Sequence, residues 1–238
     1  MDNDQPEEIN EKKLTIVEHL EELRTRLMIS VGALVVTTIL SLTFTGKFLE
    51  ILIEPAGIKP IFLRPTEMFI TYFQVALIGG VVLAMPVIVY QLIRFIVPGL
   101  RSNEKKYLYM VIPTATLLFV LGILFCFKVI LPFALRYLLT FGGDIAQAQI
   151  SIEEYISFVT TLLLWMGVAF ELPLVIVFLS KLNIVKYQQL RGYWKYAFLG
   201  SFVIAAIITP TPDPFNQTMV AVPLYLLYEI GLLFARIV

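Results

Sequence analysis

The feature that most constrains this chain is a series of apolar runs, each about as long as the hydrocarbon core of a membrane is thick. A helix needs roughly 20 consecutive apolar residues to cross that core, whereas an outer-membrane strand needs only about 10 of alternating polarity. Six runs meet the helical requirement, at about 27–45, 68–93, 107–134, 154–180, 193–209 and 215–236. The sequence therefore predicts an all-α polytopic membrane protein with six transmembrane helices between residues 27 and 236.

The composition agrees with this class and excludes several others. The chain is 58% hydrophobic and 15% charged, whereas soluble domains are about 25% charged. So little charge argues against a disordered or nucleic-acid-binding protein. Cys126 and His19 are the only residues of their types, which excludes a disulfide framework, a cysteine zinc site and an imidazole cluster. With no glycine-rich phosphate loop and no nucleophile beside a base, we expect no enzyme, no cofactor and no metal.

Lysine and arginine are distributed unequally between the two sides of the membrane. Thirteen of the 18 basic residues lie in the N-terminal segment, in or beside the loops at about 94–106 and 181–192, or at the C-terminus. Cytoplasmic loops carry such an excess of basic residues, so both termini are predicted to be cytoplasmic. The segments at about 46–67, 135–153 and 210–214 then face outward.

Local patterns place the ends of the helices. Residues 1–26 are predicted to be a cytoplasmic segment that contains a short amphipathic helix ahead of the first span. Ser151 with Glu154 has the spacing of a capping box at the start of the fourth span. Asp213, in the proline-rich turn before the last span, is predicted to cap that helix.

Glu171 is the clearest ionisable residue inside a predicted span. A charge near the bilayer centre costs about 2.5 to 3.5 kcal/mol on insertion scales, so such an acid usually faces protein or water and has a function. Its place predicts the cytoplasmic half of the span. We expect the missing side chain of Gly167, one turn earlier, to let another helix, a peptide or water come close to the carboxylate. The alternative is a protonated acid that bonds a neighbouring helix only for packing. Glu229, near the end of the last span, fits a structural position better.

A weak internal repeat bears on the function of Glu171. Shifting the sequence by 87 residues superposes the second span on the fourth, with Glu67 on Glu154, and it places Ala84 opposite Glu171. Some secondary transporters contain such repeats and bind their coupling ion near the membrane midplane. A proton-coupled transporter that uses Glu171 is therefore an alternative function, and a passive assembly scaffold is a third.

Acidic residues also stand at the predicted cytoplasmic rim, where basic residues normally prevail. Glu22 precedes the first span, and Glu104 lies in the loop before the third. Two carboxylates there favour a partner with arginines, because a guanidinium binds a carboxylate through a planar pair of hydrogen bonds that an ammonium cannot form. The alternative is that these acids only complement helix dipoles.

Five stretches of the sequence together resemble the TatC family, the large polytopic subunit of the twin-arginine protein translocase. The resemblance runs from about residue 14 to the end of the chain. The stretches are His19–Leu27, Pro65–Phe69, Pro98–Leu100 with Glu104, Phe170–Pro173 and Thr211–Gln217. The last has a proline after Asp213 as well as before it, which departs from the Thr-Pro-Pro-Asp form common in the family.

The resemblance implies a concave, glove-like bundle in a bacterial-type cytoplasmic (inner) membrane that acts as a receptor. Its ligands are the twin-arginine signal peptides of folded proteins, and its partners are single-span TatA- and TatB-type proteins, further TatC copies and the lipid bilayer. Export then uses the proton-motive force. By resemblance the signal-peptide-binding residues are Glu22, Glu104, Leu20, Arg24 and Phe95. Glu171 matches the intramembrane acid of the family, and Pro55 and Asp213 lie in its outer loops.

Overall fold

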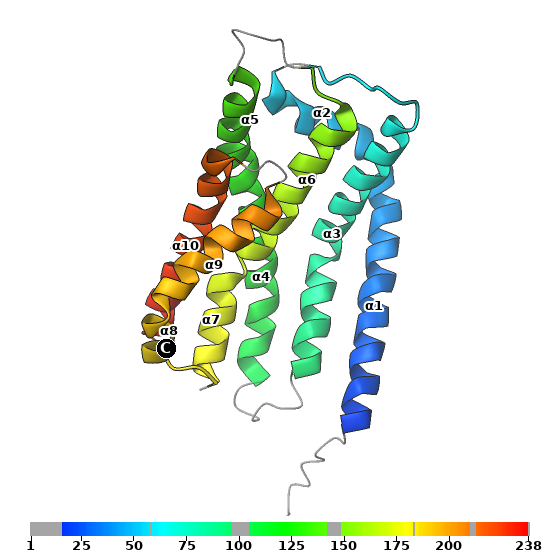
Figure 1. Ribbon diagram of the computed structural model, residues 1–238. Helices are drawn as coiled ribbons and strands as arrows, with labels where there is room; N and C mark the ends of the chain where they lie inside the picture. Colours follow the sequence, from blue (N-terminus) through cyan, green and yellow to red (C-terminus); the bar gives the residue numbers. More distant parts are fainter. Residues whose placement is uncertain are drawn as a thin grey trace, which may run out of the picture.

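The protein is built from α-helices joined by short connections (Figure 1). The structure, a computed structural model, describes residues 16–57, 59–96, 105–141, 149–182, 184–209 and 213–237. The elements in chain order are α1 (Ile16–Leu42), α2 (Thr45–Ile53), the 3-10 turn η1 (Glu54–Ala56), α3 (Glu67–Ile96), α4 (Lys105–Phe125), the π-helical turn η3 (Cys126–Ile130), α5 (Leu131–Thr140), α6 (Ile152–Ala169), α7 (Leu172–Lys181), α8 (Tyr187–Gly192), α9 (Trp194–Ile208) and α10 (Pro214–Ala235).

Five helical stretches are long and apolar enough to cross a membrane, which confirms the predicted membrane class. They are Val17–Leu42, Glu67–Ile96, Met110–Thr140, Ile152–Lys181 and Pro214–Ala235. The predicted span 193–209 corresponds to α9, which has only 15 residues. At 1.5 Å per residue α9 is about 22 Å long, shorter than the hydrocarbon core of about 30 Å. Six crossings therefore remain a prediction, which depends on whether α9 crosses the membrane.

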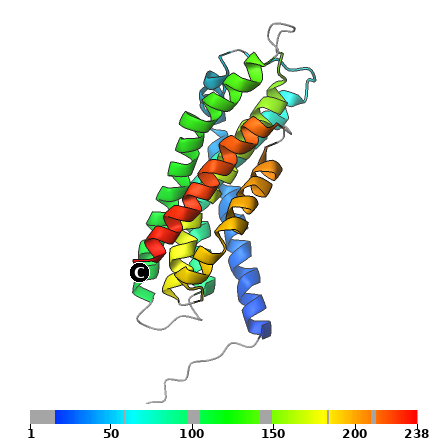
Figure 2. The same cartoon turned by 60° about the vertical axis from the view of Figure 1, so that its left-hand side comes forward.

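The helices divide the molecule into two ends (Figures 1 and 2). The starts of α1 and α4, the ends of α3, α7 and α10, and all of α8 lie at one end, which we call the basic end because most lysines and arginines are predicted there. The opposite end, which we call the cap end, carries α2, η1 and residues 59–66. In the bundle α1 packs on α3, α3 on α4 and α6, and α10 on α7 and α9.

Glycines allow the closest helix crossings. A methyl group added at Gly122 of α4 would lie 2.6 Å from the carbonyl oxygen of Met166 and 3.0 Å from the Cα atom of Gly167, both in α6. At the α1–α3 crossing, Thr37 donates a 2.8 Å hydrogen bond from its hydroxyl to the carbonyl of Gly80. Helices in membranes associate through such close backbone contacts, because lipid offers no hydrophobic drive for their association.

The core lies between α3, α4, α5, α6 and α10. Its largest fully buried side chains are those of Phe119, Ile130, Leu131, Ile156, Leu162, Met166 and Leu232. In contrast, α1 exposes most of its large apolar side chains, including Leu27, Met28, Val31, Val35, Val36 and Ile39. An apolar surface of this kind suits a lipid environment or another transmembrane helix.

Two of the long helical stretches contain an irregularity next to a proline. Residues 126–130 form a π-helical turn just before Pro132, and α6 ends at Ala169 ahead of Pro173. Proline has no amide hydrogen, so each of these positions lacks one backbone hydrogen bond of the helix. The predicted fourth span, 154–180, is therefore two helices, drawn as separate ribbons α6 and α7 in Figure 1.

Three further expectations differ from the structure. The N-terminal amphipathic helix is not separate from the first span, because α1 continues without a break from Ile16 to Leu42. The predicted outer loop 46–67 contains α2 and η1. In the proposed repeat, Ala84 is fully buried within the continuous helix α3, whereas Glu171 lies at the interruption between α6 and α7, so the two aligned positions have different surroundings.

Candidate functional site

The predicted acid Glu22 belongs to α1 and lies at the basic end, on the side of α1 that faces α3. Its Oε1 atom is 3.0 Å from Nη2 of Arg26, one turn further along α1. Nη1 of the same guanidinium donates a 3.3 Å hydrogen bond to Oε1 of Gln91 in α3. The Glu22 and Arg26 side chains are only 20% and 23% exposed, and Gln91 is buried. Glu22 is therefore a partly protected carboxylate that already binds a guanidinium.

An aromatic pair adjoins this ion pair. The ring of His19 stacks on that of Phe95, with 4.4 Å between the ring centres and 18° between their planes. His19, Glu22 and Arg26 are three and four residues apart on α1, and Gln91 and Phe95 are four apart on α3, so each set shares one helix face. We call these five residues the Glu22 site. Of them, the sequence predicted Glu22 and Phe95.

The other predicted signal-peptide residues are not part of this cluster. Leu20 and Arg24 are exposed and lie four residues apart, on a face of α1 that points away from Glu22. Arg24 borders a shallow depression of about 370 Å³ together with Glu21, Thr25 and Met28. Glu104 lies outside the described residues, although α4 begins at the next residue, Lys105.

The intramembrane acid Glu171 occupies the interruption between α6 and α7. Its amide bonds to the carbonyl of Val168, a contact three residues back, and its own carbonyl accepts from Val175. It lies in the part of Ile152–Lys181 nearer to the basic end. The Oε1 atom is buried and has no hydrogen-bond partner among the described residues. The packing bond to a neighbouring helix, which was the alternative interpretation of Glu171, is therefore not formed through this oxygen.

Gly167, one turn before Glu171, lies against α4. A methyl group added at Gly167 would lie 2.7 Å from the ring of Phe119 in α4. Of the groups expected to use the missing side chain, a neighbouring helix is therefore the one that the structure places there. The ring of Phe170, next to Glu171, packs on Phe125 of α4 with 5.5 Å between their centres.

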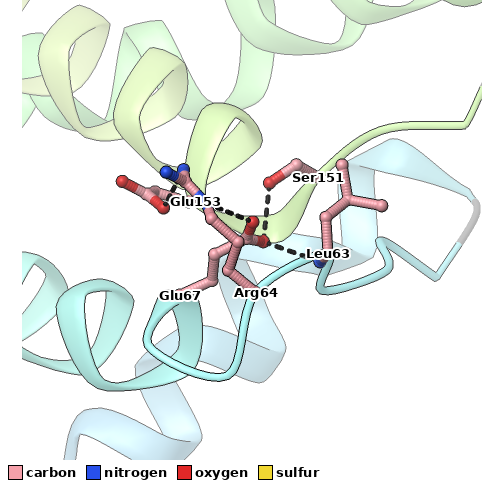
Figure 3. A network of polar contacts seen from close by, with 5 residues as sticks. All are labelled: Leu63, Arg64, Glu67, Ser151 and Glu153. Carbon is pink, nitrogen blue, oxygen red and sulfur yellow. Dashed lines mark hydrogen bonds and ion pairs between the residues drawn. The ribbon is translucent and has the colours of Figure 1, made fainter.

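A buried acid that sequence reasoning missed stands at the cap end (Figure 3). Glu67, in the first turn of α3, is 1% exposed and accepts hydrogen bonds from the Ser151 hydroxyl at 2.8 Å, the Leu63 amide at 3.2 Å and Nε of Arg64 at 3.3 Å. Arg64 also pairs with Glu153 at 3.0 Å. The signal was present in Pro65–Phe69, one of the stretches that carry the family resemblance.

This network joins the segment before α3 to the start of α6. Backbone bonds from Ile61 to Ile150 and from Ile152 to Ile61, at 3.0 and 2.8 Å, form a short parallel bridge beside it. The Tyr155 hydroxyl donates to the carbonyl of Leu52 at the end of α2. The predicted capping box at Ser151 is wrong, because the Ser151 side chain makes no helix-capping bond and its hydroxyl bonds Glu67 instead.

The remaining predicted residues have structural positions. Asp213 caps α10, as predicted, by accepting a 2.7 Å hydrogen bond from the amide of Asn216. Pro55 lies in η1, beside the buried Ala56. Glu229 pairs with Arg191 at 2.7 Å and accepts from the hydroxyl of Tyr225, so it ties α10 to α8. This agrees with the structural interpretation of Glu229.

Comparison with known proteins gives one consistent result. The sequence model described as Sec-independent protein translocase protein (TatC) matches residues 18–223. The TatC protein of Carboxydothermus hydrogenoformans is 41% identical over 97% of this chain and 96% of its own length, and that of Aquifex aeolicus is 38% identical over 94% and 95%.

Solved structures agree in fold as well as in sequence. A crystal structure titled as the twin arginine translocase receptor TatC superposes with a TM-score of 0.83 at 39% identity and covers 92% of this chain and 99% of that one. A second, in the detergent DDM, gives a TM-score of 0.85 at 40% identity. The family model spans all five of the sequence motifs, from His19 to Gln217. The chain therefore belongs to the TatC family and is a membrane component of Sec-independent protein translocation, not a catalytic enzyme.

Proposed function

We propose that this chain is the receptor that binds twin-arginine signal peptides, with its basic end in the cytoplasm. The observation that carries the proposal is the partly buried Glu22 carboxylate, which already holds the guanidinium of Arg26 at 3.0 Å. A site that binds one guanidinium has the chemistry to bind another. The matched crystal structures are of a protein titled as the receptor of the twin arginine translocase, which supports the same function.

In the proposed mechanism, Glu22 and Glu104 each take one arginine of the pair. A guanidinium places two parallel N–H donors on both oxygens of a carboxylate, whereas a lysine ammonium offers a point charge. Phe95 is half-exposed beside Glu22 and supplies an apolar contact for side chains that follow the pair. The apolar stretch of the signal peptide then lies along apolar helix surfaces such as that of α1.

Translocation requires further components in this proposal. TatA- and TatB-type single-span proteins and further copies of this chain assemble around the receptor in a bacterial-type inner membrane, and the proton-motive force drives export. Glu171, with an unpartnered buried oxygen, is proposed to hold water or a polar group of a partner helix. A polar site at this depth locally weakens the apolar barrier.

One observation supports the alternative of a proton-coupled transporter, and a stronger one argues against it. The interruption between α6 and α7 at Glu171 is of the kind that transporters use at their binding sites. However, the relatives are translocase proteins matched over almost their whole length. The structural position of Glu171 alone therefore does not favour transport of a small solute.

Photocrosslinking to a synthetic signal peptide tests the proposed function. The full chain is reconstituted in nanodiscs, and the peptide carries an Arg-Arg pair, an apolar stretch and a photoreactive group. We expect crosslinks to the wild type, their loss in the Glu22→Gln/Glu104→Gln double variant, and weak crosslinks with a Lys-Lys peptide. Glu21→Gln is the matched control, because Glu21 neighbours Glu22 in sequence but is exposed. Unchanged crosslinking in the double variant contradicts the proposal and leaves the passive scaffold.

A further inference from the structure

We propose that Arg26 is an internal competitor that occupies Glu22 until a signal peptide displaces it. Arg26 thereby sets the affinity that a ligand needs, and ligands without paired guanidinium groups, which bind more weakly, fall below it. This inference rests on the proposed function of the Glu22 site and adds how the site rejects wrong ligands. Arg26 belongs to this chain, so its guanidinium competes with any arginine or lysine that approaches the same carboxylate.

The geometry shows an incompletely satisfied guanidinium. Arg26 contacts only Oε1 of Glu22, through Nη2 at 3.0 Å, and its Nη1 bonds Gln91 at 3.3 Å. Its Nε atom is buried without a hydrogen-bond partner. Arg26 therefore does not form the planar pair of bonds that a guanidinium can make with a carboxylate. An incoming arginine that uses both oxygens of Glu22 makes the stronger complex.

Because the ion pair between Arg26 and Glu22 is partly buried, breaking it costs free energy. Exposed ion pairs contribute little, because water and salt screen them, but these two side chains are about four-fifths covered. A ligand must replace the existing pair before it gains anything from Glu22. Gln91 can keep its bond to Arg26 during the exchange, so the displaced charge is not left without a partner inside the protein.

The exchange discriminates between basic ligands. An arginine replaces a single hydrogen bond from Arg26 with a pair, whereas a lysine replaces it with a point contact of similar or lower strength. Binding of the first guanidinium gains only a small amount of free energy, because it replaces an existing ion pair. A second arginine at another carboxylate is needed for appreciable affinity. Displacing Arg26 costs every ligand the same free energy, so its removal should raise the affinity for all basic peptides by a similar factor. Weakly bound ligands should then bind at concentrations at which the wild type leaves them free.

Binding measurements with peptide pairs test the inference. The wild type, Arg26→Gln and Arg26→Lys are reconstituted in nanodiscs, and the anisotropy of labelled Arg-Arg, Arg-Gln and Lys-Lys peptides gives each Kd. In Arg26→Gln we expect all three peptides to bind about tenfold more tightly, the scale of one hydrogen bond to a charged group. The ratio of Kd values between Lys-Lys and Arg-Arg peptides should stay unchanged, because every peptide displaces the same Arg26 side chain. Arg26→Lys retains a competing charge and should keep Kd values close to those of the wild type.

Controls separate the possible failures. Lys195→Gln removes one basic residue of α9, outside the Glu22 site, and should leave all Kd values unchanged. In a Glu22→Gln background, Arg26→Gln should have no further effect on any of the Kd values. Weaker binding of every peptide to Arg26→Gln would make Arg26 a positioning residue and overturn the inference, as would unchanged values. If the wild type does not prefer Arg-Arg peptides, both the proposed function and this inference fail.

Discussion

The buried carboxylate of Glu67 accepts a 2.8 Å hydrogen bond from the hydroxyl of Ser151, 84 residues further along the chain. One residue starts α3 and the other precedes α6, so the bond fixes the relative height of two long helices at the cap end (Figure 3). A buried acceptor that loses its donor keeps the full cost of leaving water. The Glu67 side chain and the short backbone bridge between Ile61 and Ser151 together hold residues 59–66 in place.

Removing the Ser151 hydroxyl should therefore destabilise the protein. We expect Ser151→Ala to lower the free energy of unfolding by about 1 to 3 kcal/mol, because Oε2 of Glu67 then keeps only the longer bond from the Leu63 amide. Thermal unfolding in detergent measures the change. Thr43→Ala is the control, since the exposed Thr43 hydroxyl bonds only a carbonyl of its own chain segment and its loss should have little effect. Equal stability of the two variants would show that Glu67 is satisfied by other donors.

Gly122 should tolerate no side chain. A Cβ atom there would press on the backbone of Met166 and Gly167, and backbone cannot move aside as a flexible side chain can. We expect Gly122→Ala to separate α4 from α6 and to lower stability by about 1 to 3 kcal/mol. In Gly200→Ala of α9 the added atom meets open space, so alanine should leave stability unchanged or raise it by up to about 1 kcal/mol. The two melting temperatures should therefore move in opposite directions or differ by several degrees.

The sequence predicted the helices well because each depends on a long local pattern. The spans predicted at 68–93 and 215–236 became Glu67–Ile96 and Pro214–Ala235, within a few residues at each end. The length of an apolar run does not predict features that depend on one residue or on contacts between distant parts of the chain. The π-helical turn before Pro132 and the interruption before Pro173 are of the first kind.

The Glu22 site shows the same limit for function. Acids at the rim were evident in the sequence, but the contacts of Glu22 with Arg26, and of Arg26 with Gln91, depend on how α1 and α3 pack against each other. Nothing in the pattern marks Gln91, a polar residue near the end of an apolar helix. Glu67 was missed for a related reason, because its donors come from residues 63, 64 and 151.

Glu171 should not be needed for stability. Its Oε1 atom is buried without a partner, so replacing the carboxyl with an apolar group removes an unsatisfied polar atom. We expect Glu171→Leu to raise the free energy of unfolding by about 1 kcal/mol while it reduces export of a twin-arginine reporter protein in cells. Glu229→Leu is the comparison, because it breaks the contacts with Arg191 and Tyr225 and should lower stability. A destabilised Glu171→Leu variant would contradict the functional role and indicate a structural one.

The number of crossings depends on α9, and cysteine labelling resolves it. The native Cys126 is fully buried, so a membrane-impermeant maleimide applied to intact cells should report only on introduced cysteines. If α9 crosses the membrane and the basic end is cytoplasmic, Lys47→Cys and Thr211→Cys should react from outside. Lys195→Cys and Arg236→Cys should then react only after permeabilisation.

The start of α9 favours this outcome. Tyr193, Trp194 and Tyr196 are all exposed there, and such aromatic side chains concentrate at membrane interfaces. A 15-residue helix that begins at one interface reaches the other side only if the bilayer is locally thinner by several ångströms. Protection of Thr211→Cys in intact cells would mean that α9 does not cross, and labelling of Lys195→Cys from outside would reverse the orientation. Labelling of Thr211→Cys from outside, with Lys195→Cys and Arg236→Cys protected, would establish the sixth span.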